Sequence, residues 1–279
     1  MKMAHTVIKA IQNIVPKSNF ITFSKLGTHG RLGNQLFQIA AVIGSAKTYR
    51  KSAKFPRWWC NYYKICYSDY FKNKIDEGLD RSQIKFNYKE PTFEYKPIPI
   101  FKEPVDLLGY YQSESYFKHC IDDIRYYFEP ADFLIKKIND KYSNELTGNT
   151  CSIHVRRGDY SGSKIHDVCT MEYYNICILN MKSLGITKFL VFSDDIEWCK
   201  SNFTNGEFHF IEGNNPIEDL FTMSLCRHNI IANSSFSWWA SWLNKNPEKL
   251  VYAPNKWFGS ESAIKSYESI YRKDMTRIN

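Results

Sequence analysis

The pattern of hydrophobic and polar positions is regular from residue 150 onward. Short runs rich in β-branched and aromatic residues alternate there with segments whose apolar residues recur at helical spacing. The runs predict strands at about 150–154, 188–193, 208–211, 228–233 and 249–253, and the segments between them predict helices at about 170–184, 195–203, 216–227 and 235–245. This alternation predicts an α/β fold with a parallel sheet, helices on both of its faces, and an architecture typical of nucleotide-binding domains.

The first half of the chain is less regular. A strand at 20–23 precedes the loop LGTHGRLGNQ and a helix over about 34–49, and a second strand–loop–helix unit spans 105–128. Residues 56–104 are rich in aromatics, Pro and Lys and show no assignable period. The polar, turn-forming stretch SNELTGNT places a boundary between an N-terminal domain, 1–146, and a C-terminal domain, 147–279.

Composition and charge narrow the class of partner. A chain of 279 residues with 43% hydrophobic and 24% charged residues has the composition of a soluble globular protein with large cores. The net charge of +8 favours anionic partners such as phosphates, nucleotides or acidic lipids, so peripheral association with a membrane stays open. Lys and Arg are spread along the chain without a basic stripe, which argues against a nucleic-acid partner.

The N-terminal segment and the cysteines indicate the cellular compartment of the protein. In MKMAHTVIKAIQNIVPKSNF, apolar residues have helical spacing, but Lys9, Gln12 and Asn13 interrupt them. The segment is therefore a poor signal peptide, and we expect no transmembrane segment in the chain. Eight cysteines form no CxxC pair and no zinc-finger spacing, which is typical of a reduced, cytoplasmic protein.

Polar groups follow the predicted strands of the second half. HVRRGDY spans 154–160, SDD spans 193–195, EGNN spans 212–215, and NSSFSWW spans 233–239. Ligands of open parallel sheets bind outside the carboxyl ends of the strands, so we expect these groups to converge on one crevice. Asn233, Ser234 and Ser235 precede a helix, and either form a phosphate site at its N-terminus or simply cap it.

Two adjacent arginines favour the phosphate interpretation. Arg156 and Arg157 leave the strand on opposite sides, and a guanidinium matches a diphosphate with a two-pronged set of donors. The alternative is a structural ion pair, Arg157 with Asp159 or Arg156 with Asp195, which we expect for one arginine and not for both.

The other candidates have structural explanations that stay open. For His154 we favour the explanation that it is a strand residue whose partners are backbone groups. Asp194 and Asp195 would act as helix N-caps, and Asp219 would simply occupy the first turn of its helix.

Absent motifs constrain the chemistry. The chain has no GxxxxGK[ST] loop, no DxD pair and no His/Cys/Asp set at metal-ligand spacing. We therefore expect arginine and helix ends to neutralise a diphosphate without a metal ion or other cofactor.

Nearly the whole chain resembles the α-1,2-fucosyltransferases of glycosyltransferase family 11, which transfer fucose from GDP-fucose with inversion. The shared motifs are GRLGNQLFQIA, LLGYYQSESYF, IRYYFEP, HVRRGDY, MEYY, FSDDIEWCK, CRHNIIANSSFSWWASWLN and APNKWF. The resemblance implies a GT-B-like fold, in which two Rossmann-like domains face each other across a cleft. It also implies a nucleotide-sugar donor and, as acceptor, a galactoside-terminated glycan bound by the first domain.

The resemblance assigns roles to particular residues. Arg156 would hold the β-phosphate of GDP and assist its departure, His154 would line the nucleotide pocket, and Asp219 would accept hydrogen bonds from guanine. Ser234, Ser235 and Phe236 would meet the phosphates through hydroxyl and backbone N–H groups. Because they follow the strand ends, Arg157, Asp194, Asp195 and Asn233 are added to the expected donor site, and Gly33, Asn34 and Gln35 of the GRLGNQ loop complete it.

The transfer also needs a base for the acceptor hydroxyl. Asp159 is our candidate, with Asp167 and His166 behind it in the same loop. Two other functions stay open: a glycosyltransferase with another donor or acceptor, and a noncatalytic binder of glycans or polyanions.

Overall fold

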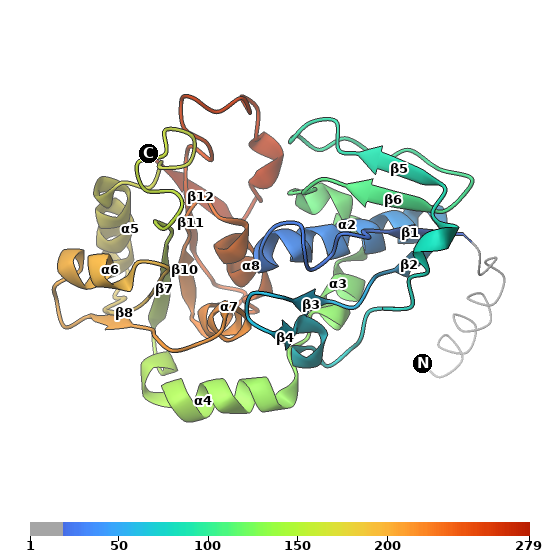
Figure 1. Ribbon diagram of the computed structural model, residues 1–279. Coiled ribbons are helices and arrows are strands. Elements are labelled where there is room, and N and C mark those ends of the chain that lie inside the picture. The colour runs from blue at the N-terminus through green and yellow to red at the C-terminus, as the bar shows by residue number, and fades with distance from the viewer. Residues whose placement is uncertain (1–18) are drawn as a thin grey trace. The chain divides into compact units, whose positions relative to one another are not determined.

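A computed structural model describes residues 19–279 of the chain, and these residues form two compact units (Figure 1). The chain divides after Glu129, so that the second unit runs from Pro130 to Asn279. The N-terminal segment in which apolar residues have helical spacing lies outside the described residues. Each unit has its own parallel sheet.

The first unit is built on a four-stranded sheet in the order β2-β1-β6-β5, with every neighbouring pair parallel. Its strands and main helix are β1 (Phe20–Thr22), α2 (Leu32–Tyr49), β2 (Ser52–Lys54), β5 (Phe86–Lys89) and β6 (Val105–Leu108). The strand predicted at 20–23 and the helix predicted at 34–49 are confirmed. Helix α2 is buried over most of its length because its sequence is apolar on nearly all sides.

The segments without a sequence period form short elements. A hairpin joins β3 (Trp59–Cys60) to β4 (Ile65–Cys66), and the rest of this region is held by 3-10 helices. These are η1 (Tyr67–Tyr70), η2 (Arg81–Gln83), η3 (Glu114–Tyr116) and η4 (Lys118–Cys120), and η4 is followed by α3 (Ile121–Tyr127). Fully buried aromatic side chains such as Trp58 and Tyr67 fill the space between them. Packing of large rings, rather than a repeating pattern, organises this part of the chain.

The second unit has a six-stranded parallel sheet in the order β12-β11-β10-β7-β8-β9. Its strands are β7 (Thr150–Val155), β8 (Lys188–Ser193), β9 (Phe208–Phe210), β10 (His228–Ile230), β11 (Val251–Pro254) and β12 (Met275–Ile278). Its helices are α4 (Asp132–Leu146), α5 (Met171–Ser183), α6 (Ile196–Asn202), α7 (Pro216–Leu225), α8 (Ser235–Leu243) and the 3-10 helix η5 (Glu268–Ile270). The five strands and four helices predicted after residue 150 are all present, while α4 and β12 were not anticipated.

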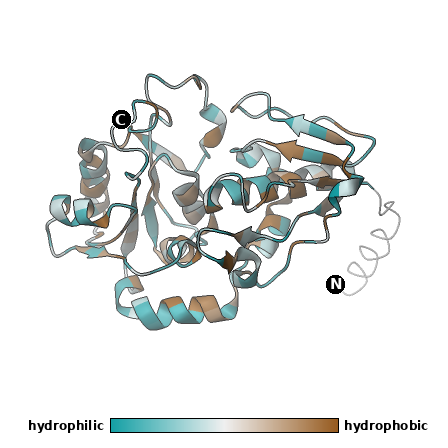
Figure 2. Cartoon of the chain, viewed as in Figure 1, coloured by the Kyte–Doolittle hydropathy of each residue, from teal (hydrophilic) through white to brown (hydrophobic). Residues whose placement is uncertain are grey.

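Helix α4 accounts for the difference between the predicted boundary after residue 146 and the division after Glu129. Its buried residues Leu134, Ile138 and Tyr142 recur every four positions, and Lys137 Nζ lies 2.6 Å from Glu218 Oε1 in α7. Figure 2 colours α4 in alternating hydrophilic and hydrophobic segments, typical of a helix with one buried face. These contacts place α4 in the second unit.

Within residues 19–279, none of the helices combines the length and the apolar character needed to cross a bilayer. All eight cysteines lie in this part of the chain as free thiols, and Cys199 and Cys226 are buried.

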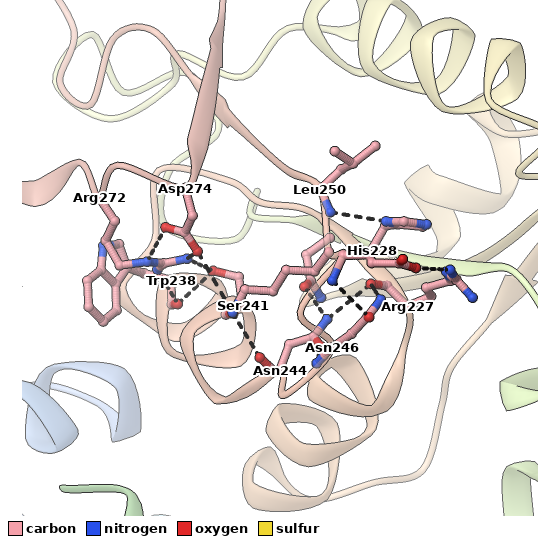
Figure 3. A network of polar contacts seen from close by, with 12 residues as sticks. Arg227, His228, Trp238, Ser241, Asn244, Asn246, Leu250, Arg272 and Asp274 are labelled. Carbon is pink, nitrogen blue, oxygen red and sulfur yellow. Dashed lines mark hydrogen bonds and ion pairs between the residues drawn. The ribbon is translucent and has the colours of Figure 1, made fainter. Parts of the chain in front are cut away.

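A buried polar network holds the C-terminal half of α8 in place (Figure 3). Arg272 donates to Asp274 through Nε at 2.8 Å, to the Trp238 carbonyl at 3.2 Å and to Ser241 Oγ at 3.1 Å. Its guanidinium also stacks over the Trp238 ring, 4.6 Å from the centroid. Because Asp274 directly precedes β12, the network ties α8 to the edge of the sheet.

We predict that Arg272→Met lowers the free energy of unfolding by about 2 kcal/mol, because it removes these donors and leaves Asp274 with only the more distant Lys249, 3.8 Å away, as a cationic partner. Urea denaturation followed by circular dichroism measures the change. Lys136→Met is the matched control, since Lys136 pairs with Asp140 at 2.8 Å on an exposed helix surface. Equal shifts in both variants would contradict a special role for the buried network.

Candidate functional site

Topology gathers the predicted groups along one edge of the second sheet. Strands β10, β7 and β8 are neighbours, so the groups that follow them lie side by side at their carboxyl ends. These groups are Asn233-Ser234, Arg156-Arg157 and Asp194-Asp195. The expected convergence of the strand-end groups is therefore confirmed for these three strands.

Arg156 is held between two carboxylates. Its Nη1 lies 2.5 Å from Asp194 Oδ2, and its Nη2 donates to Asp159 Oδ1. The guanidinium also lies over the ring of Tyr160, 5.1 Å from the centroid. The Arg156 side chain is only 13% exposed, whereas that of Asp159 is 57% exposed. Of these two acidic partners, Asp159 is therefore the one that can exchange with an incoming anion.

Arg157 points to the opposite side, as expected from strand geometry. Its Nε donates to Asp195 Oδ2 at 3.2 Å, and its guanidinium stacks 4.0 Å from the Trp198 ring in α6. We expected an ion pair for only one of the two arginines, and that expectation is wrong, because both are paired. The reason is that Val155 and Ser193, the last residues of β7 and β8, are paired, so the two acids that follow β8 lie beside the two arginines that follow β7.

Asp194 organises the loop after β7. Its Oδ1 accepts hydrogen bonds from the backbone N–H of Arg157 at 2.9 Å and of Gly158 at 3.2 Å, while Oδ2 pairs with Arg156. A Cβ on Gly158 would lie 2.4 Å from Asp194 Oδ2, so any other residue at this position would push the Asp194 carboxylate out of place. Asp194 thus holds both the loop and the cation.

Asp195 combines two of the contacts considered from the sequence. It caps α6 by accepting from the Trp198 N–H at 3.3 Å, and it pairs with Arg157. Its expected helix-cap role is confirmed.

His154 connects β7 to α8. Its Nδ1 lies 2.9 Å from Ser237 Oγ, and its ring lies 5.5 Å from the Phe236 ring. Burial, and secondarily the nearby Arg156 charge, lower the pKa of His154 to about 4. A strand residue satisfied by the backbone was the favoured explanation, but the partner of the ring is a side chain. Ser237 was missed, although it lies inside NSSFSWW, because the pattern there indicates only a helix.

The start of α8 lies at the same edge of the sheet. Ser234 is its N-cap and accepts from the Phe236 N–H at 3.3 Å, which confirms the capping alternative for this serine. Ser235 and Phe236 are half-buried in the first turn. The positive end of the helix dipole is therefore at the strand-end groups.

Asn233 has a structural task. Its Nδ2 donates to the carbonyl of His166 at 2.9 Å and to that of Trp257 at 3.0 Å, and the side chain is buried. Both amide hydrogens therefore hold neighbouring loops together.

Asp219 lies in the first turn of α7, at the end of the sheet where β9 ends. Its Oδ1 accepts from Asn214 Nδ2 at 2.9 Å, and Asn214 in turn accepts from Lys141 Nζ at 2.8 Å. Burial, and secondarily the charge of Glu218, raise the pKa of Asp219 to about 7. A carboxyl group with this pKa changes charge near neutrality.

The loop of the candidate base is partly ordered by its own side chains. Asp159 is paired with Arg156, Asp167 Oδ2 accepts from the Gly162 N–H at 3.0 Å, and the His166 ring stacks 4.7 Å from Tyr160. Any role of Asp159 as a base requires its release from Arg156.

The GRLGNQ residues belong to the first unit. Gly33, Asn34 and Gln35 form the first turn of α2. Gln35 is buried, accepts from Trp58 Nε1 at 2.6 Å and donates to the Gly30 carbonyl at 2.9 Å. Asn34 Oδ1 accepts from Gln112 at 2.8 Å. The amide of Gln35 therefore shapes the loop, and contact of these residues with a ligand stays a prediction.

No group of three or more His, Cys, Asp or Glu in residues 19–279 is placed to hold a metal ion.

Comparison with known sequences identifies relatives over most of the chain. A model of glycosyl transferase family 11 matches residues 3–279. An O-antigen biosynthesis glycosyltransferase of Escherichia coli, WbnK, is 30% identical over 85% of this chain and 95% of its own length. An α-1,2-colitosyltransferase of Escherichia coli is 31% identical over 83% and 91%. A galactoside 2-α-L-fucosyltransferase of Caenorhabditis elegans is 25% identical over 90% and 78%.

Solved structures share the fold at low sequence identity. Fucosyltransferase NodZ from Bradyrhizobium matches with a TM-score of 0.54 at 11% identity, covering 82% of this chain and 94% of NodZ. POFUT1 in complex with GDP matches with a TM-score of 0.58 at 13% identity, covering 86% and 99%. These matches confirm the GT-B-like α/β fold class.

We predict that His154 stays neutral from pH 7 down to about pH 5, because its pKa is about 4 in the folded chain and about 6.5 in the unfolded chain. Unfolding then takes up a proton as the pH falls below 6.5, and stability is lost toward pH 4. His154→Gln should remove on the order of 3 kcal/mol of this acid dependence, measured by urea denaturation at pH 7 and 4. A ring NMR signal of His154 that titrates near pH 6.5 would contradict the prediction.

Proposed function

The chain belongs to glycosyl transferase family 11, and from this membership we propose that it transfers L-fucose from GDP-β-L-fucose to the 2-hydroxyl of a galactoside-terminated glycan. The α-1,2 linkage would form with inversion and without a metal ion. The observation that carries the proposal is Arg156, a largely buried cation at the carboxyl end of β7, close to the start of α8. Membership also favours a transferase over a noncatalytic binder.

Arg156 supplies the charge that the leaving group needs. In the transfer, the bond between the fucosyl C1 and the β-phosphate oxygen breaks, and its electron pair goes to the diphosphate. A preorganised guanidinium and the positive end of α8 stabilise that developing charge. The β-phosphate takes the place of Asp159, while Asp194 keeps Arg156 and the loop aligned.

Release of Asp159 provides the base. Once the diphosphate binds Arg156, the Asp159 carboxylate is available to take the proton of the acceptor 2-hydroxyl as its oxygen bonds to C1. His154 is neutral near pH 7, so it lines the pocket without adding a positive charge beside the phosphates. Ser237 holds the ring of His154 in place.

Asp219 is the proposed partner of the guanine base. One carboxylate oxygen accepts from Asn214, which fixes the plane of the carboxylate. Ionised Asp219 can accept hydrogen bonds from guanine N1–H and the exocyclic amine, a pair of donors that matches a carboxylate.

The 31% identity to an α-1,2-colitosyltransferase supports a second candidate donor. Colitose is the 3-deoxy form of L-fucose, so the same leaving group and the same phosphate contacts serve both sugars.

The function is tested by incubating the full chain with GDP-fucose, GDP-colitose or UDP-galactose and a panel of β-galactosides in EDTA, with product linkage determined by NMR. The proposal expects an α-1,2-fucosylated product from GDP-fucose with EDTA present. Transfer from GDP-colitose alone would establish the second candidate instead. A strict need for added metal would overturn the metal-free mechanism.

We predict that Arg156→Ala lowers kcat by about 10²–10³-fold and weakens GDP binding, because the cation of the leaving group is lost. Asp159→Asn should act in the opposite direction on binding: GDP binds more tightly, because a competing carboxylate is gone, while turnover falls. Isothermal titration calorimetry and initial rates separate the two effects.

Arg277→Ala is the matched control for Arg156, because Arg277 also pairs with an acid, Glu268 at 2.7 Å, and lies over a tyrosine ring at 3.7 Å. Its kinetics should stay those of the wild type. Unchanged GDP affinity in both Arg156→Ala and Asp159→Asn would remove Arg156 from the phosphate site.

We predict that GDP binds more weakly at pH 6 than at pH 8, because the pKa of Asp219 is about 7 and only the ionised carboxylate accepts from both guanine donors. In Asp219→Asn, GDP affinity should depend less on pH. The dependence that remains comes from ionisation of the GDP phosphates, which is the same in both proteins. Calorimetry at the two pH values measures the difference. Equal slopes in the two proteins would contradict guanine recognition by Asp219.

A further inference from the structure

Three aromatic rings of the first unit form a stack from the core to the surface. His29 and Tyr110 follow β1 and β6, which are paired strands, so both loops lie at the carboxyl edge of that sheet. Their rings are 4.8 Å apart and inclined by 22°, and Phe23 lies behind His29 at 5.9 Å. Phe23 is fully buried, whereas Tyr110 is 39% exposed. The stack therefore presents one supported ring to the solvent.

The two loops are fixed before any ligand binds. Buried Gln38 donates from Nε2 to the carbonyl of His29 at 3.1 Å and to that of Gly109 at 3.2 Å. The Glu90 carboxylate accepts from the N–H groups of Tyr110 at 2.7 Å and Tyr111 at 2.9 Å. Preorganisation of this kind lowers the entropy lost on binding.

Polar groups suited to hydroxyls surround the stack. The His29 ring makes no hydrogen bond to the described part of the chain, and burial, with the Lys25 charge second, lowers the pKa of His29, so the ring is neutral near pH 7. Gln112 donates a 2.8 Å hydrogen bond to Asn34. This amide pair lies near His29, because Gly30, the next residue in the chain, packs against Asn34. A neutral imidazole and amides both donate and accept, as sugar hydroxyls do.

We propose that the exposed face of Tyr110, supported by His29, is the platform on which the galactopyranose ring of the acceptor glycan stacks. The axial 4-hydroxyl of galactose leaves the C–H groups of C3, C4 and C5 together on the opposite face. These weakly positive hydrogens match the negative face of an aromatic ring. The inference rests on the proposed transfer to a galactoside and identifies the residues that bind that acceptor.

Direct binding tests the platform independently of catalysis. Saturation-transfer NMR of a methyl β-galactoside with the full chain should show the strongest transfer to H3, H4 and H5. Tyr110→Ala should abolish this pattern, and Tyr110→Phe should keep it, because the ring face is retained. In the transfer reaction, Tyr110→Ala should raise the acceptor KM by about tenfold and leave GDP affinity unchanged.

Tyr126→Ala is the matched control, because Tyr126 is another exposed tyrosine of the first unit, at 56%. It should leave both galactoside binding and KM unchanged. A wild-type protein that shows no galactoside contact, a Tyr110→Ala variant with unchanged galactoside binding, or a loss of GDP affinity in that variant would each overturn the platform. Absence of fucosyl transfer with the NMR pattern intact would instead refute the proposed function alone.

Discussion

The candidate site of the second unit depends on the contacts of one carboxylate, that of Asp194. One oxygen binds two backbone N–H groups of the loop after β7, and the other binds the guanidinium of Arg156. A largely buried cation needs a fixed counter-charge, and a loop at a strand end needs acceptors for its N–H groups. A single acid on the neighbouring strand meets both needs, so the position of Arg156 follows from the register between β7 and β8.

The second half of the chain was predictable because its elements are individually regular. Buried parallel strands such as 188–193 are continuous apolar runs, and Pro216 with Glu218 marks a helix start, so β8 and α7 begin where the pattern placed them. The first half escaped prediction where single large residues decide the structure. Buried Trp58 packs against Tyr67 and donates from its indole nitrogen to Gln35 of α2, and no local period records such contacts.

The sequence predicted which residues gather at the candidate site better than it predicted which of them pair with each other. The rule that ligands of parallel sheets bind at the carboxyl ends of the strands predicted that Arg156, Asp194 and Ser234 share one edge of the sheet. Which acid pairs with which arginine depends on side-chain reach: Arg156 takes Asp159 and Asp194, while Asp195 goes to Arg157. The hydroxyl that holds His154 comes from Ser237 in the first turn of α8, where the pattern of apolar and polar residues in NSSFSWW indicates only a helix.

Asp159 is close to Arg156 along the chain, and this closeness affects how a bound anion leaves Arg156. A carboxylate tethered three residues away is present at a high effective concentration around the guanidinium. As a product anion loosens, this built-in competitor can occupy the vacated position before the anion returns. In the proposed reaction, this tether weakens equilibrium retention of the diphosphate product and shortens its residence time.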